Sequence, residues 1–346
     1  MALTAFSLVG LYHLAVLAGT AAKVLGFGEP FDSWYGPIAR GTVSIGTIEA
    51  DVYTSSASRT PILLVHGVNE TGKNSPEVRR VAEALAGSGF RVVAPEFVRL
   101  TRQTVTPADI DDVVSVFRSF GGNGGMVCAS YGCGPTLVAA SRPEIRGQVR
   151  FIVIFGGYSD LTETVRSIVT GPPSPLGYSK WTYMAANSDL LGNERDRQII
   201  GAIADERVKR PAEEWTLSEG LGVEARALLA LYESQSGEEF DTRLRETPLL
   251  RDRMERLSPS RYFDGLRARL IIIHMISDPC IPFTESLRMA EAAKARGIPY
   301  SLTILRMYGH TRPEWPELGV GSLFSYYIPE SWKFIRVLHE VLSYAE

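Results

Sequence analysis

Short, mostly apolar runs that end in glycine or polar residues recur along the chain and predict strands buried on both faces. Such strands occur in parallel sheets that helices cover on both sides. Ahead of these runs, residues 42–48 and 48–54 alternate apolar and polar positions and predict two strands joined near Gly46. These runs, apolar apart from Arg91, Arg150 and His274, are residues 61–65, 90–94, 125–129, 149–155 and 270–274, and a last strand is predicted at 300–305.

Amphipathic helices are predicted between these strands. Ser75 and Pro76 begin the first, as a capping hydroxyl followed by a proline at the first helical position. The next begins at residues 106–107, and three aspartates fill its first turns, where the helix dipole favours negative charge. Alternating strands and helices predict an open, mostly parallel α/β sheet, in which functional residues lie at the carboxyl ends of the strands.

The strand pattern stops between residues 157 and 267, where helical patterns and proline or glycine breakers replace it. We expect this stretch to be a helical cap over the strand ends; a separate domain with its own task is the alternative. The expected domains are an apolar N-terminal segment at residues 1–27, a core formed by 28–156 and 268–346, and a cap at 157–267.

Residues 2–22 carry no charge and are about as long as a helix that spans a bilayer. This segment predicts a membrane anchor or interfacial helix, with two alternatives: an export signal cleaved near residues 19–21, or a helix packed on the body. Lys23, the first positive charge, favours a cytoplasmic body under the positive-inside tendency. We therefore expect a membrane-associated protein, with the side of the membrane open, and exported or cytoplasmic protein as alternatives.

The composition is that of an ordinary globular protein: 346 residues, a net charge of −3 and a charged content of 22%. No strongly basic stretch predicts a nucleic-acid partner. The three cysteines, Cys128, Cys133 and Cys280, lack the spacing of a metal-ligand set, and no metal is expected. We expect all three to be free, buried thiols.

Ser130 lies where a predicted strand turns sharply into a predicted helix. A serine at such a corner matches the G-x-S-x-G pattern of a nucleophile, in which small residues two before and two after let strand and helix pass closely. Gly132 fits this pattern, and Cys128 replaces its first glycine. Ser130 is therefore the candidate nucleophile, and an ordinary helix cap is the alternative.

A serine nucleophile needs a base, and the chain has five histidines. His13 lies in the apolar N-terminal segment and His339 inside the last predicted helix. His66 precedes the serine in the chain, and His274 lies within an apolar strand as an expected core residue. His310 follows the last strand in a loop, which is the position that a general base needs.

The third member of the site is a carboxylate that orients the base. Asp278 follows the strand that ends near His274, and Asp160 follows the strand at 149–155. Both could be turn formers. We favour Asp278, because Ser130, Asp278 and His310 then give the order serine, acid, histidine known for one such architecture.

Two backbone N–H groups are expected to stabilise the developing oxyanion, one from Tyr131 and one from Val68. His66 and Gly67 precede Val68 and support this loop, because glycine lets the backbone approach the site closely. A phosphate-binding turn is the alternative, but the loop lacks the glycine-lysine-serine spacing of nucleotide-binding loops.

Together these motifs resemble those of the α/β-hydrolase fold superfamily, in particular its bacterial esterase-like members. The resemblance covers about residues 42–345 and implies a mostly parallel central sheet, flanking helices and a helical cap insertion. It also implies a catalytic triad of Ser130, Asp278 and His310. The sequence departs from the family pattern at Cys128 and Cys133, where glycine is usual. The motifs that carry the resemblance lie at residues 64–67, 72–95, 129–132, 278–282 and 309–310.

The resemblance implies a serine hydrolase that cleaves carboxylic esters of small molecules through an acyl-enzyme, with no cofactor. A serine peptidase or amidase is one alternative, since the Ser-Tyr-Gly elbow also resembles that of prolyl-oligopeptidase relatives. A catalytically silent binding protein that keeps the fold is another. The acyl and alcohol specificity, the physiological substrate and the oligomeric state stay open at this level.

Overall fold

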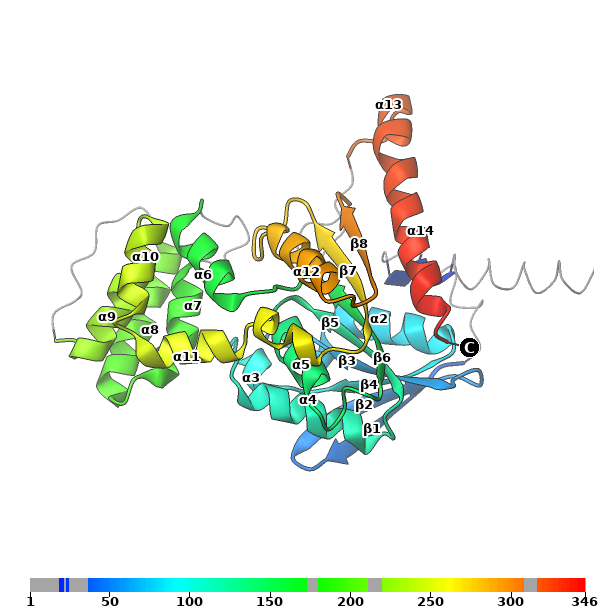
Figure 1. Ribbon diagram of the computed structural model, residues 1–346, viewed down its shortest axis with the longest axis horizontal. Coiled ribbons are helices and arrows are strands. Elements are labelled where there is room, and N and C mark those ends of the chain that lie inside the picture. Colours follow the sequence, from blue (N-terminus) through cyan, green and yellow to red (C-terminus); the bar gives the residue numbers. More distant parts are fainter. Residues whose placement is uncertain are drawn as a thin grey trace, which may run out of the picture.

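An eight-stranded sheet forms the centre of the molecule (Figure 1). The computed structural model describes residues 19–21, 23, 24, 37–172, 180–210, 220–307 and 316–345. The strand order is β1-β2-β4-β3-β5-β6-β7-β8; β1, β2 and β4 pair antiparallel, and the pairs from β4 through β3 to β8 are parallel. The strands are β1 Ala39–Ile45, β2 Ile48–Thr54, β3 Thr60–Val65, β4 Phe90–Pro95, β5 Gly124–Ala129, β6 Val149–Phe155, β7 Arg269–Met275 and β8 Tyr300–Leu305.

The central parallel strands are mostly apolar on both faces because helices cover both sides of the sheet. On one face, the buried side chains of α2 (Pro76–Gly87) and α14 (Ile328–Leu342) pack against the sheet. On the other face, α4 (Ala108–Ser119), α5 (Cys133–Ser141) and α12 (Thr284–Ala295) form a larger core. The predicted start of α2 is confirmed, since Ser75 Oγ accepts a hydrogen bond from the Val78 N–H at 3.1 Å.

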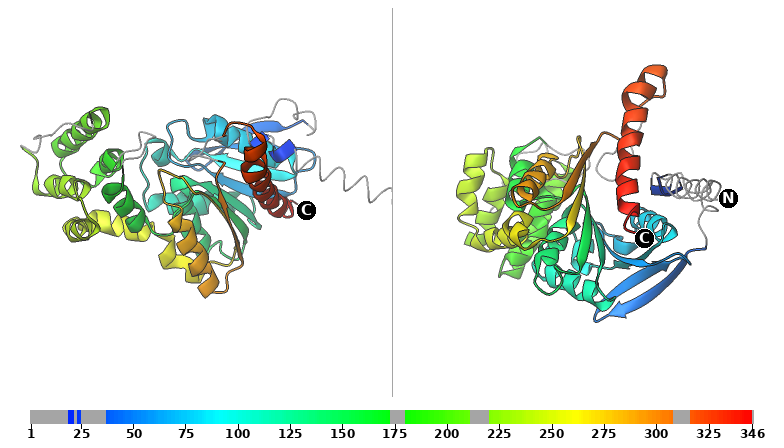
Figure 2. Two further views of the ribbon diagram at one scale, coloured as in Figure 1. Left: turned by 90° about the horizontal axis from the view of Figure 1, so that it is seen from above. Right: turned by 45° about the vertical axis from the view of Figure 1, so that its right-hand side comes forward.

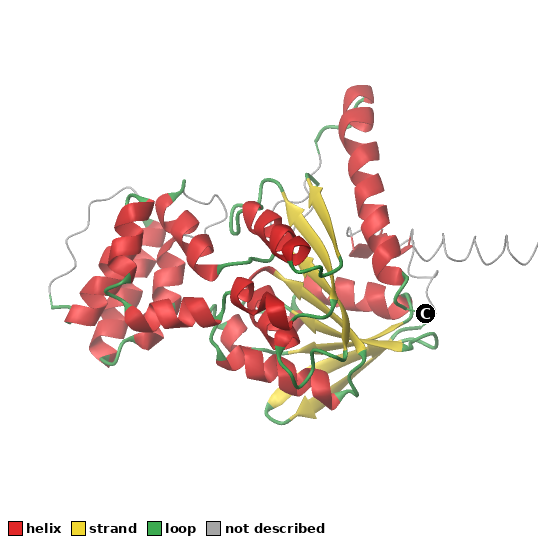
Figure 3. Ribbon diagram, in the orientation of Figure 1, coloured by secondary structure: helices red, strands yellow, loops and turns green. Residues whose placement is uncertain are grey.

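Between β6 and β7, the described residues form helices and no strand (Figure 3). These helices gather at one end of the sheet, as both views of Figure 2 show. They are α6 Leu161–Thr170, α7 Lys180–Ala186, η4 Ser188–Leu190, α8 Glu194–Lys209, α9 Val223–Tyr232, α10 Gly237–Leu244, α11 Pro248–Arg256 and η5 Pro259–Gly265.

The helices α6–α11 contact the core at the carboxyl ends of the strands. The hydroxyl of Thr104, in the loop after β4 and the short helix α3 (Val98–Thr101), donates to the carbonyl oxygen of Ala186 in α7 at 3.5 Å. The rings of Tyr131, directly after β5, and Tyr183 in α7 have centroids 5.2 Å apart. That residues 157–267 form a cap over the strand ends stays a prediction.

The N-terminal segment lies largely outside the described residues. Of residues 1–27, Gly19, Thr20, Ala21, Lys23 and Val24 are described, and they are helical. Lys23 forms an ion pair with Glu83 of α2 at 3.0 Å. Among the helices of the described ranges, none combines the length and the apolar character that crossing a bilayer requires. The expectation of a membrane anchor at residues 2–22 therefore stays a prediction.

Candidate active site

Ser130 occupies a strained turn between β5 and α5. Its φ is +52°, in the left-handed region that a residue with a side chain enters only at a cost of roughly 1–2 kcal/mol. The strand β5 ends at Ala129, the short helix η3 spans Ser130–Gly132, and α5 follows at Cys133. This geometry is that of a nucleophile elbow, where strain is maintained because it aims the serine out of the turn.

Two glycines let the backbone pass close to this turn. A Cβ at Gly132 would clash with the carbonyl oxygen of His66, so strand β3 and the start of the helix can approach only with glycine there. A Cβ at Gly67 would lie 3.0 Å from Cβ of Ser130. The loop after β3 therefore runs directly beside the serine, as the proposed oxyanion role of Val68 requires.

His66 supports this loop and uses both ring nitrogens to do so. The Phe97 N–H donates to Nε2 at 3.2 Å, so Nδ1 carries the proton and donates to the carbonyl oxygen of Gly67 at 2.7 Å. Burial lowers the pKa of His66, which keeps the ring neutral in this arrangement. His66 is therefore placed to hold Gly67 and Val68.

A buried ion pair fixes the far end of the same loop. The ammonium of Lys73, in the short helix η2 (Gly72–Asn74), lies 3.0 Å from a carboxylate oxygen of Asp51 on β2. Arg40 on β1 bonds the other oxygen of Asp51 at 2.6 Å. The backbone N–H of Lys73 donates to Glu96 at 3.0 Å. The loop from Gly67 to Lys73 is thus tied to the sheet at both ends.

Tyr131 supplies the other expected oxyanion donor. Its N–H belongs to the first turn of the helical run that begins at Ser130, where N–H groups have no partner within the helix. Its ring is buried against Tyr158, with centroids 5.6 Å apart, and against Tyr183 of α7. Burial raises the pKa of the Tyr131 hydroxyl well above its usual value, so the ring serves as neutral packing. The sequence pattern pointed to Tyr131 for its backbone N–H, but not to the packing of its ring against Tyr158 and Tyr183.

Asp278 is fully buried in the turn that follows β7. Its Oδ1 accepts the N–H groups of Cys280 at 2.8 Å and Ile281 at 3.0 Å. Its Oδ2 lies 3.5 Å from Nε2 of His274. His274 is the buried core residue that the sequence predicts: Nε2 lies 2.9 Å from the Ile281 carbonyl oxygen and Nδ1 lies 2.7 Å from the Ser286 hydroxyl. The strand end and its hydrogen bonds hold the Asp278 carboxylate in one orientation.

Asp160, the competing acid, caps helix α6. Its Oδ1 accepts the N–H groups of Thr162 at 2.9 Å and Glu163 at 3.3 Å, and hydroxyls of Ser258 and Ser260 approach the same carboxylate. These contacts give Asp160 a structural task that explains its position after β6.

His310 lies outside the described residues, which stop at Met307 and resume at 316. The strand before it, β8, pairs in parallel with β7, the strand that precedes Asp278. The chain therefore leaves both strands at the same edge of the sheet. The distance from His310 to Ser130 or Asp278 stays a prediction.

A disulfide joins Cys128 and Cys133, and the expectation of free thiols is wrong for these two residues. The sharp turn at Ser130 folds α5 back against β5 and brings the two Cα atoms to 5.0 Å, within the range of a disulfide. The bridge therefore encloses the candidate nucleophile. Cys280 is free and buried, as expected, and burial raises its pKa to about 12.

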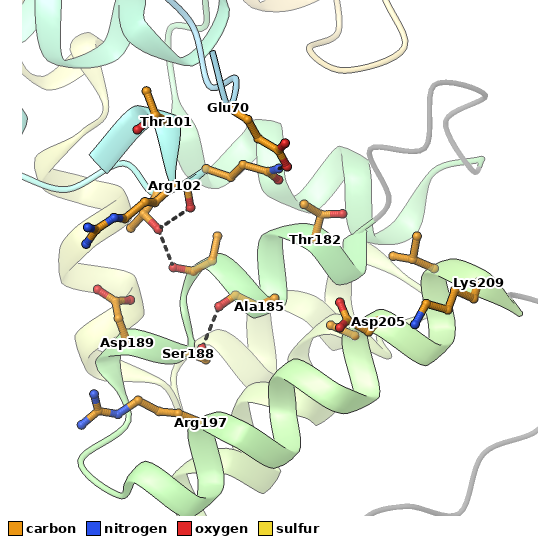
Figure 4. A pocket seen from close by; sticks show the side chains of 15 residues that line it. Glu70, Thr101, Arg102, Thr182, Ala185, Ser188, Asp189, Arg197, Asp205 and Lys209 are labelled. Atoms are coloured by element: carbon orange, nitrogen blue, oxygen red, sulfur yellow. Dashed lines mark hydrogen bonds between the residues drawn. The ribbon is translucent and has the colours of Figure 1, made fainter. Parts of the chain in front are cut away.

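A cavity of about 830 Å³ lies between the core and the helices α7 and α8 (Figure 4). One wall comes from Glu70, in the loop after β3, and from the residues that follow β4; the other comes from the helices. Charges of both signs and several hydroxyls face it, so polar ligands are favoured over wholly apolar ones. The charged lining residues are Glu70, Arg102, Asp189, Arg197, Asp205 and Lys209.

Comparisons with solved structures decide the fold. An acylaminoacyl peptidase from Pyrococcus horikoshii superposes with a TM-score of 0.51 and 14% identity, covering 89% of this chain and 41% of its own. A puromycin-hydrolyzing peptidase from Mycobacterium tuberculosis gives 0.51 and 13%, covering 90% and 39%. Both are α/β-hydrolase fold proteins. This chain has the α/β-hydrolase fold.

The chain spans about two fifths of the length of these peptidases. Neither a protein-family model nor a curated protein sequence matches it. The α/β-hydrolase fold of this chain places Ser130 after β5 and Asp278 after β7, at the carboxyl edge of one parallel sheet. At this identity the likeness concerns the fold, and the activity is argued from the site.

Proposed function

We propose that the protein is a serine hydrolase that cleaves carboxylic esters with Ser130, Asp278 and His310. The left-handed backbone of Ser130, with φ +52°, is the observation that carries this proposal. A helix cap needs no such conformation, because capping serines have extended backbones. Strain at a residue between strand and helix is maintained where it orients a reactive group.

In the proposed reaction, Oγ of Ser130 attacks the ester carbonyl carbon while His310 takes the hydroxyl proton. The N–H groups of Tyr131 and Val68 stabilise the oxyanion, each by roughly 3 kcal/mol in the transition state. His310 then gives its proton to the departing alcohol, and an acyl group stays on Ser130. Water, deprotonated by His310, releases the acid and restores the serine. Asp278 orients the imidazole throughout, and the cycle needs no cofactor.

Substitutions at the two acids and the serine test this proposal. We expect Ser130→Ala to lower kcat/KM for nitrophenyl esters on the order of 10⁶-fold and Asp278→Asn by about 10⁴-fold. Asp160→Asn is the matched control: asparagine caps a helix about as well as aspartate, so both stability and turnover should stay near those of the wild type. Wild-type ester hydrolysis by Ser130→Ala would exclude the mechanism. Loss of turnover in Asp160→Asn alone would move the acid to that position.

Amide hydrolysis is the second candidate, because the Ser130-Tyr131-Gly132 elbow resembles that of prolyl-oligopeptidase relatives. Rates on acyl esters and on aminoacyl amides of matched acyl length separate the two activities. Labelling with a fluorophosphonate probe separates both from a silent binding protein, since only an activated serine reacts. Labelling that Ser130→Ala abolishes supports a hydrolase of either kind.

A further inference from the structure

A row of large apolar side chains lies exposed on the C-terminal helical segment. The segment comprises α13 (Val320–Ser322), the π-helix η6 (Leu323–Tyr327) and the first turns of α14. We call the row the α13–α14 apolar surface. Its side chains have exposed fractions between 50% and 78%; they are Leu318, Val320, Phe324, Ile328 and Trp332.

The surface is one continuous face of this segment. Val320, Phe324, Ile328 and Trp332 recur every four residues, which places them one above another along a helix. Figure 1 and the right view of Figure 2 show α13 and the first turns of α14 projecting beyond the sheet. Within the part of the chain that the structure describes, these side chains are far more exposed than the buried apolar residues later in α14.

The opposite, polar side of the segment is fixed to the body. Glu330 is buried, and its carboxylate accepts the Arg306 N–H at 2.8 Å, the Arg306 side chain at 2.9 Å and the Lys333 ammonium at 2.8 Å. Lys333 also donates to the carbonyl oxygen of Ile304 on β8 at 3.0 Å. These bonds set the rotation of α14, so the apolar row points outward as part of the fold.

The uncharged N-terminal stretch reaches the body on the same side of the sheet. The described residues 19–21, 23 and 24 lie beside α14 in Figures 1 and 2, and Ala21 and Val24 pack on the core that the buried face of α14 helps to form. Residues 2–18, which precede them, contain no charged side chain. The described residues that follow the uncharged stretch therefore lie on the same side of the molecule as the exposed apolar helix face.

We propose that the α13–α14 apolar surface docks on a lipid bilayer, as a second contact next to the N-terminal segment. A helix that lies in the bilayer interface exposes aliphatic and aromatic side chains on one face, and tryptophan and tyrosine prefer the headgroup region. Phe324 and Trp332, with the aliphatic side chains of Val320 and Ile328, have this composition. The charge-free segment at 2–18 favours lipid as the occupant over a second copy of the chain.

The proposal can be tested by measuring the environment of this surface when the full-length chain is bound to vesicles of phosphatidylcholine and phosphatidylglycerol. A nitrobenzoxadiazole label at Phe324→Cys reports its surroundings, and the same label at Val223→Cys, an equally exposed apolar position on α9, is the matched control. We expect a blue shift and quenching by brominated lipid at 324 and neither at 223. A label at 324 that stays in water on vesicle-bound protein would overturn the proposal, as would a chain that does not bind vesicles.

Flotation gives a second readout. We expect Phe324→Ser with Trp332→Ser to weaken vesicle partitioning by roughly tenfold to a hundredfold, while Val223→Ser with Leu249→Ser leaves it unchanged. Both pairs replace exposed side chains, so folding is preserved, and circular dichroism checks this. Equal partitioning of the two pairs contradicts the proposal. A blue shift without vesicles that grows with protein concentration would assign the surface to a second copy instead.

Discussion

His66 and His274 illustrate how a single buried side chain can position a loop. Each ring has both nitrogens engaged, His66 by Phe97 and Gly67 and His274 by Ser286 and Ile281. A buried imidazole with two fixed partners is costly to replace, because any substitute leaves one of the partners unsatisfied. These rings hold the loops that carry Val68 and Asp278.

The burial of His66 predicts a specific dependence of stability on pH. Burial lowers its pKa in the folded protein, whereas in the unfolded chain it titrates near the ordinary value of about 6.5. Between these two pKa values the unfolded state binds more protons, so the free energy of unfolding decreases as pH falls below about 6.5. Denaturation at several pH values measures this slope. We expect it to be shallower in His66→Asn and unchanged in His339→Asn, where the side chain is exposed.

The sequence predicted where the candidate residues lie relative to the strands, but not which side chains contact them. Ser130 and Asp278 could be placed because strand ends are visible as boundaries of apolar runs. The Cys128–Cys133 disulfide could not be predicted, because two cysteines five residues apart can pair only if the chain between them reverses its direction. The contacts among Tyr131, Tyr158 and Tyr183 could not be predicted either, because these residues lie far apart in the sequence. They belong to η3, to the loop after β6 and to α7.

At the scale of secondary-structure elements, the bounds of a strand were predicted correctly where its side chains form an apolar run with clear ends. The strands β6 and β8 begin and end at the predicted residues. Helix α12 was not predicted, because its buried face consists of small or polar side chains such as Ser286 and Ala290 that contrast little with its exposed face. The last predicted helix, which contains His339, is α14; it begins at Ile328, and its first turns are apolar on the exposed side.

The disulfide is a link between two elements, and its removal is expected to destabilise their junction. Closing so short a loop restricts the unfolded chain by roughly 2 kcal/mol. We expect Cys128→Ala with Cys133→Ala to lower the free energy of unfolding by about this amount. Thermal melts with and without dithiothreitol provide the measurement: the reductant should lower the melting temperature of the wild type and leave that of the double variant unchanged. A wild type insensitive to the reductant under unfolding conditions would contradict the bridge.

At the scale of the whole molecule, one hydrophobic core runs from the sheet into the cap helices. The same cluster of buried side chains contains Val113 and Leu137 beside the sheet and Met184 and Leu228 in α7 and α9. Where buried contacts are continuous, two parts of a chain unfold together. The domain boundaries expected from the sequence therefore separate stretches of the chain whose buried side chains belong to one cluster.

This continuity predicts one cooperative unfolding transition. We expect Met184→Ala, which creates a cavity in α7, to lower the free energy of unfolding by about 2–5 kcal/mol and to shift the entire calorimetric peak. Val223→Ala, at an exposed position on α9, should change it by less than about 0.5 kcal/mol. Two separate peaks, with only one shifted by Met184→Ala, would show that cap and core are independent units.

The walls of the cavity can be varied separately from the candidate catalytic residues. Its walls come from different parts of the chain: Glu70 and Arg102 from loops of the core, and Asp189, Arg197 and Lys209 from the helices opposite. None of these side chains belongs to the elbow at Ser130 or the turn at Asp278. A library of variants restricted to the helical wall would therefore test whether this cavity takes part in ligand binding while leaving Ser130 and Asp278 untouched.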